Sequence, residues 1–186
     1  ELDEWEKFGL IERSKSAWSA PIVVVAKKNG EIRICIDYRK LNSKTIKDAY
    51  PIPRPDDMLD SLGRAKYFST LDMVRSYLQV PVATEDREKT AFVSSKGLYQ
   101  FIMMPFGLTN APATFQRLVD HVLAGLTWQK CLIYLDDIIV FSETFEEHKE
   151  RLEAVFSRLQ QANLKLKLEK CRFVQNEVKF LGFIVS

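Results

Sequence analysis

Two adjacent aspartates, Asp136 and Asp137, interrupt a run of apolar, β-branched and aromatic residues that extends from Cys131 to Ser142. Runs of this composition are typical of β-strands, so the sequence predicts a hairpin that carries both carboxylates at or beside its tip. Two carboxylates about 4 Å apart repel by roughly 4 kcal/mol at an effective dielectric of about 20. A fold that holds them together therefore needs protons, a cationic partner or a metal ion, unless the pair is simply a solvated turn.

A third aspartate, Asp72, ends a second apolar and aromatic run that begins at Tyr67. If the two runs form neighbouring strands of one sheet, Asp72, Asp136 and Asp137 meet on a single rim. Clustered carboxylates are costly without a cation, and carboxylate oxygens are ligands that suit Mg²⁺. The pattern therefore predicts a two-metal site of the kind that stabilises the attacking and leaving oxygens in nucleotidyl transfer.

Strand-like segments recur in the first half of the chain. Strands are predicted over residues 21–28 and 31–37, and Asn29-Gly30 between them is a strong hairpin signal. Residues 90–94 and 98–103 predict a second hairpin.

Helix signals follow the strands. Asp56 is a candidate N-cap of a short helix, residues 115–123 carry an apolar stripe of helical period, and Thr144 opens a capping box. Residues 164–185 alternate around positions 175–177 and predict a closing hairpin. We therefore expect an α+β protein in which helices cover one face of the sheet that carries the acids.

Length and composition limit the class of protein. The 186 residues, of which 46% are hydrophobic, suffice for one domain or two closely packed subdomains. The formal net charge is only +2, so nucleic-acid binding cannot be inferred from charge. Three widely spaced cysteines without a CxxC pattern predict neither a disulfide framework nor a zinc site, and they favour a reducing compartment. No apolar run approaches the roughly 18 residues of a membrane span.

The isolated histidines and the chain ends add two expectations. His121 and His148 stand alone in helical stretches and are interpreted as structural or surface residues. The chain begins at Glu1 without a methionine and ends in an apolar run. We expect it to be a segment of a longer polypeptide.

Six sequence motifs follow one another along nearly the whole chain. They are Trp18–Pro21, Arg33–Asn42, Leu71-Asp72 followed by Tyr77, Met104–Gln116, Tyr134–Asp137 and Phe180–Phe183. In this order they resemble the reverse transcriptase of gypsy-class long-terminal-repeat retroelements and of related retroviruses and pararetroviruses. One such motif is weak support, but six in the order of the family make the resemblance specific.

The resemblance implies the fingers and palm of a right-hand polymerase, with an antiparallel palm sheet backed by helices. It assigns residues 1–46 and 80–110 to the fingers subdomain and residues 47–79 and 111–186 to the palm subdomain. The thumb and RNase H segments of the family are expected outside this chain.

The resemblance also implies an RNA- and DNA-directed DNA polymerase that extends a primer on an RNA or DNA template with deoxynucleoside triphosphates. Two Mg²⁺ ions, which Mn²⁺ can replace, would be held by Asp72 and Asp136 with support from Asp137. The rest of a polyprotein, with its thumb and RNase H, is an expected partner, and a membrane is not. The expected location is the cytoplasm, within virus-like particles, and the oligomeric state stays open.

The predicted ribbon over residues 21–37 offers a cationic face. Strand periodicity places Arg33, Cys35 and Asp37 on one side and the isoleucines at 32, 34 and 36 on the other, where they pack inward. Arg33 and the nearby Lys28 would then face a cleft and could hold phosphates, or they could be solvated surface cations.

The resemblance assigns a set of residues to the incoming nucleotide. Arg33 and Lys28 match cations that contact the triphosphate, and Tyr77 matches an aromatic gate that excludes a 2′-hydroxyl. The loop beneath the nucleotide matches Phe106 and Gly107, but retroviral relatives carry glutamine where Phe106 stands, so the sugar contact there is open. Tyr77 could instead be a core aromatic residue.

A second set is assigned by resemblance to the template and the primer. The first residues of the set contact the template strand or the templating base, and the last form the hairpin that grips the primer end. The apolar members of that hairpin could equally belong to the core. The set comprises Cys35, Asp37, Arg39, Tyr134, Leu135, Phe180, Leu181 and Gly182.

Two other classes of function stay open at this point. The chain could be a catalytically inactive, polymerase-derived module that only binds nucleic acid, although the presence of all three aspartates argues against this. It could also be a structural piece of a viral particle, which predicts no nucleotide binding and no role for the acids.

Overall fold

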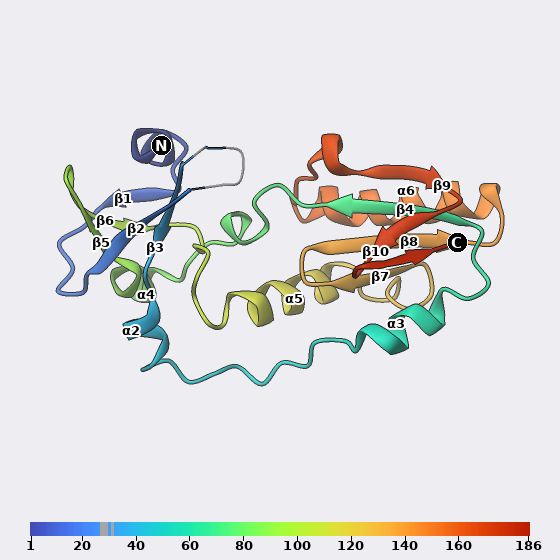
Figure 1. Ribbon diagram of the computed structural model, residues 1–186, viewed down its shortest axis with the longest axis horizontal. Coiled ribbons are helices and arrows are strands. Elements are labelled where there is room, and N and C mark those ends of the chain that lie inside the picture. Colours follow the sequence, from blue (N-terminus) through green and yellow to red (C-terminus); the bar gives the residue numbers. More distant parts are fainter. Residues whose placement is uncertain (27–29, 31) are drawn as a thin grey trace. The chain divides into compact units, whose positions relative to one another are not determined.

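The structure is a computed structural model that describes residues 1–26, 30 and 32–186. The chain consists of two compact units (Figure 1). The first unit contains Glu1–Asp48 and Tyr77–Pro112, and the second contains Ala49–Ser76 and Ala113–Ser186. Each unit has a hydrophobic core of its own. In the described part of the chain, no helix is long and apolar enough to span a membrane.

The first unit is built on one sheet with the strand order β1-β6-β5-β2-β3. Its neighbouring strands are antiparallel except β2 and β5, which run parallel. The strands are β1 (Ile11–Arg13), β2 (Ala20–Ala26), β3 (Ile32–Ile36), β5 (Phe92–Ser94) and β6 (Gly97–Phe101). The helical segments are α1 (Leu2–Lys7), α2 (Arg39–Asn42), α4 (Thr84–Arg87) and the 3₁₀ helices η1 (Ser76–Gln79) and η2 (Glu88–Thr90).

Both strand pairs predicted for this unit are confirmed. β2 and β3 pair antiparallel from Ile22↔Ile36 to Ala26↔Ile32. β5 and β6 also pair antiparallel, ending at Ser94↔Gly97. Asn29, one of the two residues predicted to turn the first hairpin, lies outside the described residues.

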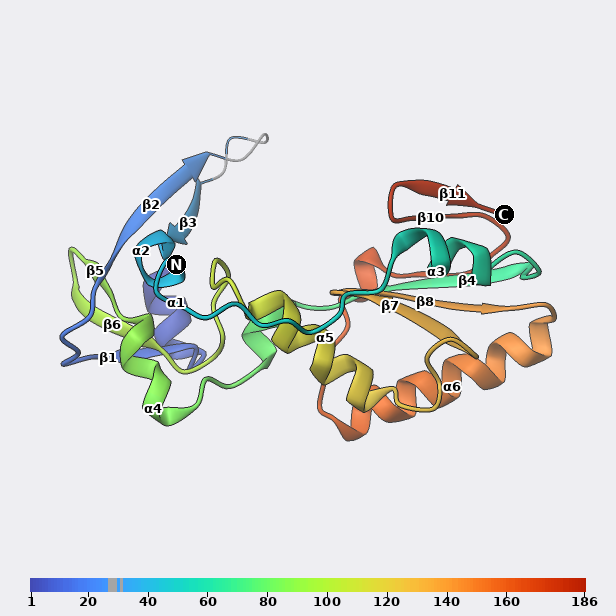
Figure 2. The same cartoon turned by 90° about the horizontal axis from the view of Figure 1, so that it is seen from below.

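The inward packing predicted for the isoleucines of β3 holds for only part of the strand. Ile36 is 8% exposed and Ile34 packs against the core, whereas Ile32 is 64% exposed. The core of this unit lies at the Ile36 end, around Tyr38 and Phe92, and the β2–β3 pair extends beyond it (Figure 2). The prediction for Ile32 is wrong because strand period decides which face a residue takes and not whether that face is covered.

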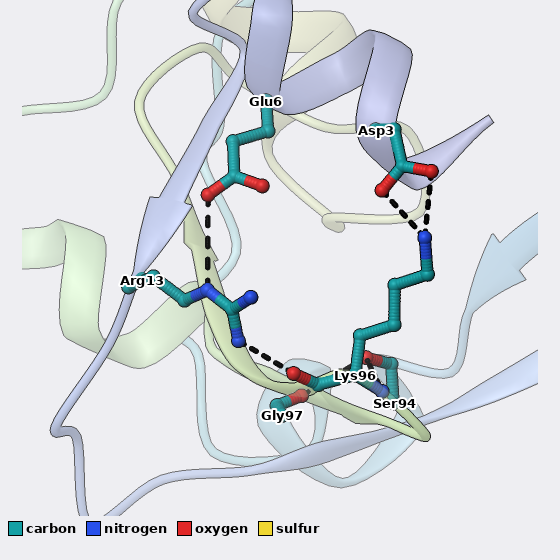
Figure 3. Close-up of polar contacts among 6 residues, drawn as sticks. All are labelled: Asp3, Glu6, Arg13, Ser94, Lys96 and Gly97. Atoms are coloured by element: carbon teal, nitrogen blue, oxygen red, sulfur yellow. Dashed lines mark hydrogen bonds and ion pairs between the residues drawn. The ribbon is translucent and has the colours of Figure 1, made fainter.

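Polar contacts tie α1 to the β5–β6 turn (Figure 3). The ammonium of Lys96 lies 2.6 Å from both carboxylate oxygens of Asp3. Arg13 of β1 donates to the carbonyl of Lys96 and lies 3.7 Å from Glu6. Gly97 has φ +123°, and a Cβ there would lie 2.7 Å from a guanidinium nitrogen of Arg13. This turn therefore requires glycine.

The second unit is built on an antiparallel sheet with the strand order β7-β8-β4-β9. Its strands are β4 (Tyr67–Asp72), β7 (Cys131–Tyr134), β8 (Asp137–Ser142) and β9 (Arg172–Gln175). Its helices are α3 (Pro55–Ser61), α5 (Ala111–Val122), which begins in the first unit, α6 (Phe145–Gln161) and the 3₁₀ helix η3 (Leu168–Lys170). A separate strand pair, β10 (Val178–Phe180) and β11 (Phe183–Val185), ends the chain.

Both faces of this sheet are covered, which corrects the expectation that helices cover one face only. Helix α6 lies on one face, and α3 and β10 lie on the other (Figure 2). Met58 of α3 and Phe180 of β10 share a core cluster with Phe68 and Ile139 of the sheet. Burial on both faces explains why residues 138–141 are all apolar and buried instead of alternating with polar residues.

The predicted closing hairpin around positions 175–177 is wrong. β9 pairs with β4 in the sheet, and β10 pairs with β11 around Leu181 and Gly182. These two residues have φ values of +51° and +88°, the left-handed conformations that a two-residue turn between antiparallel strands requires. The signal for the hairpin is therefore the glycine at 182 and not the polar residues near 176.

The two predicted helix starts have different outcomes. The hydroxyl of Thr144 accepts a hydrogen bond from the backbone N–H of Glu147 at 3.3 Å, so Thr144 caps α6 as predicted. Helix α3 begins at Pro55, with Arg54 as the N-cap residue. Asp56 lies inside the first turn and is not the cap, because proline provides the helical φ at the first position.

Candidate active site

The β7–β8 hairpin carries two of the predicted aspartates at its tip. Tyr134 pairs with Asp137, which leaves Leu135 and Asp136 as the turn. Leu135 adopts the left-handed conformation with φ +57°. Asp136 and Asp137 are exposed, whereas the residues on either side of the tip are partly or fully buried. The hairpin therefore raises two charges from an apolar core, as the sequence predicts.

The third aspartate joins them through the register of the sheet. β4 and β8 pair from Tyr67↔Ser142 to Asp72↔Asp137, so Asp72 and Asp137 are direct cross-strand partners at the last position of the ladder. Although Asp137 is exposed as a residue, desolvation of its carboxylate raises its pKa. The charges of Asp136 and Asp72 raise the pKa further, and Lys170 opposes this in part. The rim therefore favours the approach of a cation.

Lys170, which sequence reasoning did not single out, supplies a cation beside this rim. Its ammonium lies 3.2 Å from a carboxylate oxygen of Asp72. The contact depends on the chain after α6, where Lys167 donates its backbone N–H to the Asp72 carbonyl at 2.8 Å. Nothing in the sequence marks Lys170, because its partner lies 98 residues away and the pairing arises only in the fold.

A hollow of ≈ 540 Å³ opens beside Asp72 and is lined by Arg75, Lys167, Lys170 and Glu169 among others. Together with Asp72 itself, the lining holds three cations and two carboxylates, so the hollow has a lining of mixed charge beside the rim.

The donor set of the rim suits a hard divalent cation. Asp72, Asp136 and Asp137 offer carboxylate oxygens only, and Mg²⁺ binds through one or two carboxylates together with water and substrate phosphates. Within residues 1–26, 30 and 32–186, no group of three His, Cys, Asp or Glu side chains could hold a metal ion by itself. Asp72 also pairs with Lys170, whose ammonium would compete with a metal ion for this carboxylate.

Three of the residues predicted to contact a nucleotide lie together in the first unit. The rings of Tyr77 and Phe106 have centroids 5.0 Å apart, and the guanidinium of Arg33 lies 5.5 Å above the ring of Phe106. Phe106 is 40% exposed. Gly107 has φ +96°, and a Cβ there would touch the backbone of Ile36 at 3.5 Å. The predicted Lys28 lies outside the described residues.

The residues predicted to contact the template lie at the end of β3. Arg39 binds both carboxylate oxygens of Asp37, the closest at 2.6 Å, and its side chain is 89% exposed. The side-chain hydrogen bond from Arg39 lowers the pKa of Asp37 to about 2. Cys35 is half-buried and carries a free thiol. Arg39 is therefore held in place by Asp37 while it faces solvent.

The residues predicted to grip the primer differ in their accessibility. Phe180 is only 3% exposed and belongs to the core cluster that contains Met58. Its side chain supports the β10–β11 hairpin from inside and is not available to a primer. Leu181 is half-buried and Gly182 is exposed, both within the turn.

Comparisons with known proteins agree with this geometry. Residues 25–185 match the family described as "Reverse transcriptase (RNA-dependent DNA polymerase)". The chain belongs to this family. Reverse transcriptases depend in general on divalent metal ions.

Relatives in sequence come from retrotransposons. The chain is 46% identical over 191 residues to the "Retrovirus-related Pol polyprotein from transposon 297" of Drosophila melanogaster and 43% identical over 192 residues to that of transposon gypsy from the same organism. Each match covers 100% of this chain but only 18% and 19% of the relatives. The resemblance to gypsy-class reverse transcriptases is thereby confirmed, and the chain spans about a fifth of these polyproteins.

Solved structures confirm the fold class. The foamy viral protease–reverse transcriptase in complex with double-stranded DNA matches with a TM-score of 0.91 and 30% identity, over 100% of this chain and 32% of that one. Its complex with an RNA/DNA hybrid matches equally well, over 25% of that chain. The chain therefore has the α+β fold of a reverse transcriptase, with an antiparallel sheet and helices packed against it.

Proposed function

We propose that this chain forms the catalytic core of a reverse transcriptase, an RNA- and DNA-directed DNA polymerase that adds deoxynucleotides to a primer 3′-hydroxyl. The observation that carries the proposal is the pairing of Asp72 with Asp137 in the β4–β8 ladder, beside Asp136 at the hairpin tip. Membership of the reverse transcriptase family supports it. The foamy viral relatives, whose structures contain double-stranded DNA and an RNA/DNA hybrid, support it as well.

In this proposal, Asp72 and Asp136 are the principal ligands of two Mg²⁺ ions, or of Mn²⁺ in their place, and Asp137 supports them. When bound, such ions activate a hydroxyl nucleophile and neutralise a leaving pyrophosphate. The side chains then have little covalent chemistry to perform, and their task is to hold the carboxylates at the rim and to orient the substrates. The raised pKa of Asp137 fits this role, because a bound cation offsets both burial and repulsion.

Residues of the first unit are proposed to contact the deoxynucleoside triphosphate. Arg33, together with Lys28, would bind its phosphates, and Tyr77 would exclude a ribose 2′-hydroxyl. The ring of Phe106, which contacts both Arg33 and Tyr77, would pack below the sugar with Gly107.

Template and primer contacts complete the proposal. Cys35, Asp37 and Arg39 would contact the template strand. Tyr134 and Leu135, at the tip of the β7–β8 hairpin, would contact the template or the primer, and Leu181 and Gly182 would contact the primer. We propose that the first unit is the fingers subdomain and the second the palm subdomain. A thumb and an RNase H from the same polyprotein would be its partners in cis.

A primer-extension assay tests the proposal directly. The chain, alone and joined to its native downstream sequence, is mixed with a labelled primer on an RNA or a DNA template, the four deoxynucleotides and Mg²⁺. We expect extension on both templates that stops when EDTA is added. Binding of the primer–template without extension in either form would instead favour the inactive nucleic-acid-binding module.

A further inference from the structure

A buried glutamine on α5 contacts the turn that carries Asp136. Gln116 is fully buried, and its side-chain oxygen Oε1 accepts a hydrogen bond from the backbone N–H of Leu135 at 2.7 Å. Its nitrogen Nε2 lies 3.4 Å from the carbonyl of Ile133 on the strand before the turn. One amide thus contacts the backbone on both sides of Tyr134, and it holds the turn against the helix.

The turn needs such a contact because its backbone is in an uncommon conformation. Leu135 has φ +57°, which its Cβ disfavours and which glycine would adopt freely. Backbone in this region persists when the surrounding structure holds it there. Because Asp136 directly follows Leu135, any relaxation of this residue would redirect the Asp136 carboxylate.

The carboxylate of Asp120 fixes the orientation of the Gln116 amide. Nε2 of Gln116 lies 3.1 Å from Oδ1 of Asp120, one helical turn further along α5. An ionised carboxylate only accepts hydrogen bonds, so the amide must present its nitrogen to Asp120 and its oxygen to Leu135. The other oxygen of Asp120 accepts from the Tyr50 hydroxyl at 2.8 Å. Asp120 is therefore held from both sides.

We propose that Gln116 is a positioning residue for the catalytic turn, with Asp120 and Tyr50 setting the direction of its amide. Gln116 fixes the left-handed conformation of Leu135 and through it the direction of Asp136, without touching the substrate itself. This inference rests on the proposed polymerase function, because only there does the direction of Asp136 matter.

The first test compares Gln116→Met with Val119→Ala. Methionine keeps the size of the side chain but loses the hydrogen bonds. Val119 is a fully buried residue on the same helix whose side chain cannot hydrogen-bond to the turn, so its truncation to alanine destabilises the protein without removing the Gln116 contacts. We expect Gln116→Met to lower the kcat of single-nucleotide incorporation at least tenfold, with the KM for the deoxynucleotide changed less than threefold. Val119→Ala should keep the parent kcat per folded molecule. Equal losses of kcat in the two variants would overturn the inference.

A double-mutant cycle with Leu135→Gly separates positioning from general packing. Glycine accepts positive φ without support, so the turn in this variant depends less on Gln116. We expect Gln116→Met to cost at least tenfold in kcat in the parent and less than threefold in the Leu135→Gly background. The same cost in both backgrounds would contradict a role that acts through the Leu135 conformation.

Amide hydrogen exchange provides a readout that does not depend on activity. The Leu135 N–H should exchange at least tenfold faster in Gln116→Met than in the parent, with no comparable change in Val119→Ala. If Gln116→Met does not fold, Asp120→Asn carries the same test, because an asparagine no longer dictates which way the Gln116 amide faces. Unchanged Leu135 exchange in the folded variant would overturn the inference. A parent chain that extends no primer but shows this exchange pattern would refute the proposed function and leave the positioning contact intact.

Discussion

The two ends of the β4–β8 strand pair carry polar groups of opposite kinds. At one end, Asp72 faces Asp137 across the ladder, and both are negatively charged when ionised. Toward the other end, His148 of α6 is fully buried between Ser69 of β4 and Ser142 of β8. The same two strands thus hold one cluster of like charges and one cluster of neutral groups.

Each ring nitrogen of His148 has a partner. Nδ1 lies 3.0 Å from the hydroxyl of Ser142, which donates to the Thr144 carbonyl at 2.8 Å, so Nδ1 must carry the proton. Nε2 lies 2.7 Å from the Ser69 hydroxyl and accepts from it. The oxygen of Ser69 in turn accepts from the backbone N–H of Val174 at 3.0 Å. This network is complete with a neutral imidazole.

The difference separates a structural polar cluster from a functional one. At the His148 end, donors and acceptors match, so the cluster stabilises the fold and needs no further partner. At the Asp72 end, the carboxylates repel one another. Lys170, which pairs with Asp72, offsets only part of the effect that raises the pKa of Asp137. Unbalanced charge on a rigid sheet rim is the arrangement expected of a site that binds a cation.

The largest effect on stability should come from the neutral end. We expect His148→Ala to lower the free energy of unfolding by about 3 kcal/mol, because it leaves a cavity and removes one of the two hydrogen-bond partners of each of the Ser69 and Ser142 hydroxyls. Urea unfolding measures this, with His121→Ala on the exposed side of α5 as the control. If the two histidine variants lose the same stability, the His148 network has no structural role.

The pH dependence of stability should also follow His148. Burial lowers the pKa of His148 below its usual value of 6.5, and Arg151 lowers it further. Its contribution is therefore complete above pH 6.5 and is lost as the pH falls through the pKa of the folded state, because the unfolded chain takes up the proton first. Thermal unfolding between pH 7 and pH 5 should show this loss in the parent, and the loss should be smaller in His148→Gln. A parallel pH profile in that variant would contradict the assignment.

The opposite sign is expected at the acidic end. The pKa of Asp137 in the folded protein is raised above its usual value of 3.8. The ionised carboxylate therefore destabilises the fold once the pH exceeds the pKa that Asp137 has in the unfolded chain. Asp137→Asn should therefore raise the melting temperature at pH 7 in the presence of EDTA, and this gain should vanish below a pH of about 4. A lower melting temperature of Asp137→Asn at pH 7 would show that repulsion among the carboxylates does not destabilise the fold.

The smallest effect should come from the counter-ion. Lys170→Met should lower stability by less than about 1 kcal/mol, because the Lys170 side chain is 59% exposed and such pairs are weak. The loss should shrink in 1 M salt, where exposed charges are screened. Lys179→Met on the exposed side of β10 serves as the control. A loss that salt does not change would mean that Lys170 acts through packing.

Sequence reasoning reaches the acids more securely than their surroundings. The composition of the runs before Asp72 and around Asp136 predicts the strands that carry these acids. Pairing of these strands is then enough to bring the acids together on one rim. The contact of His148 with Ser69 and that of Lys170 with Asp72 do not follow, because these partners lie 79 and 98 residues away in the chain. Interaction at such separation depends on tertiary packing, which no local pattern records.

The errors in the predicted fold have similar physical causes. Ile32 is exposed because the core ends before it, and the chain around position 176 is not a hairpin because β4 offers β9 an edge to pair with. Both outcomes depend on which neighbour is available in space. Gln116 belongs to one of the six sequence motifs. Its contact with the turn depends on the left-handed backbone conformation of Leu135, which a leucine in the sequence does not predict.

The most direct test of the acidic rim is the rate of single-nucleotide incorporation by Asp136→Asn. The substitution is nearly isosteric and removes one proposed metal ligand, so the account predicts loss of Mg²⁺-dependent incorporation by at least about 1,000-fold, with the fold intact. Asp60→Asn, an exposed aspartate on α3, should retain the parent rate. Incorporation by Asp136→Asn at the parent rate would contradict the claim that the β4–β8 rim is the catalytic site.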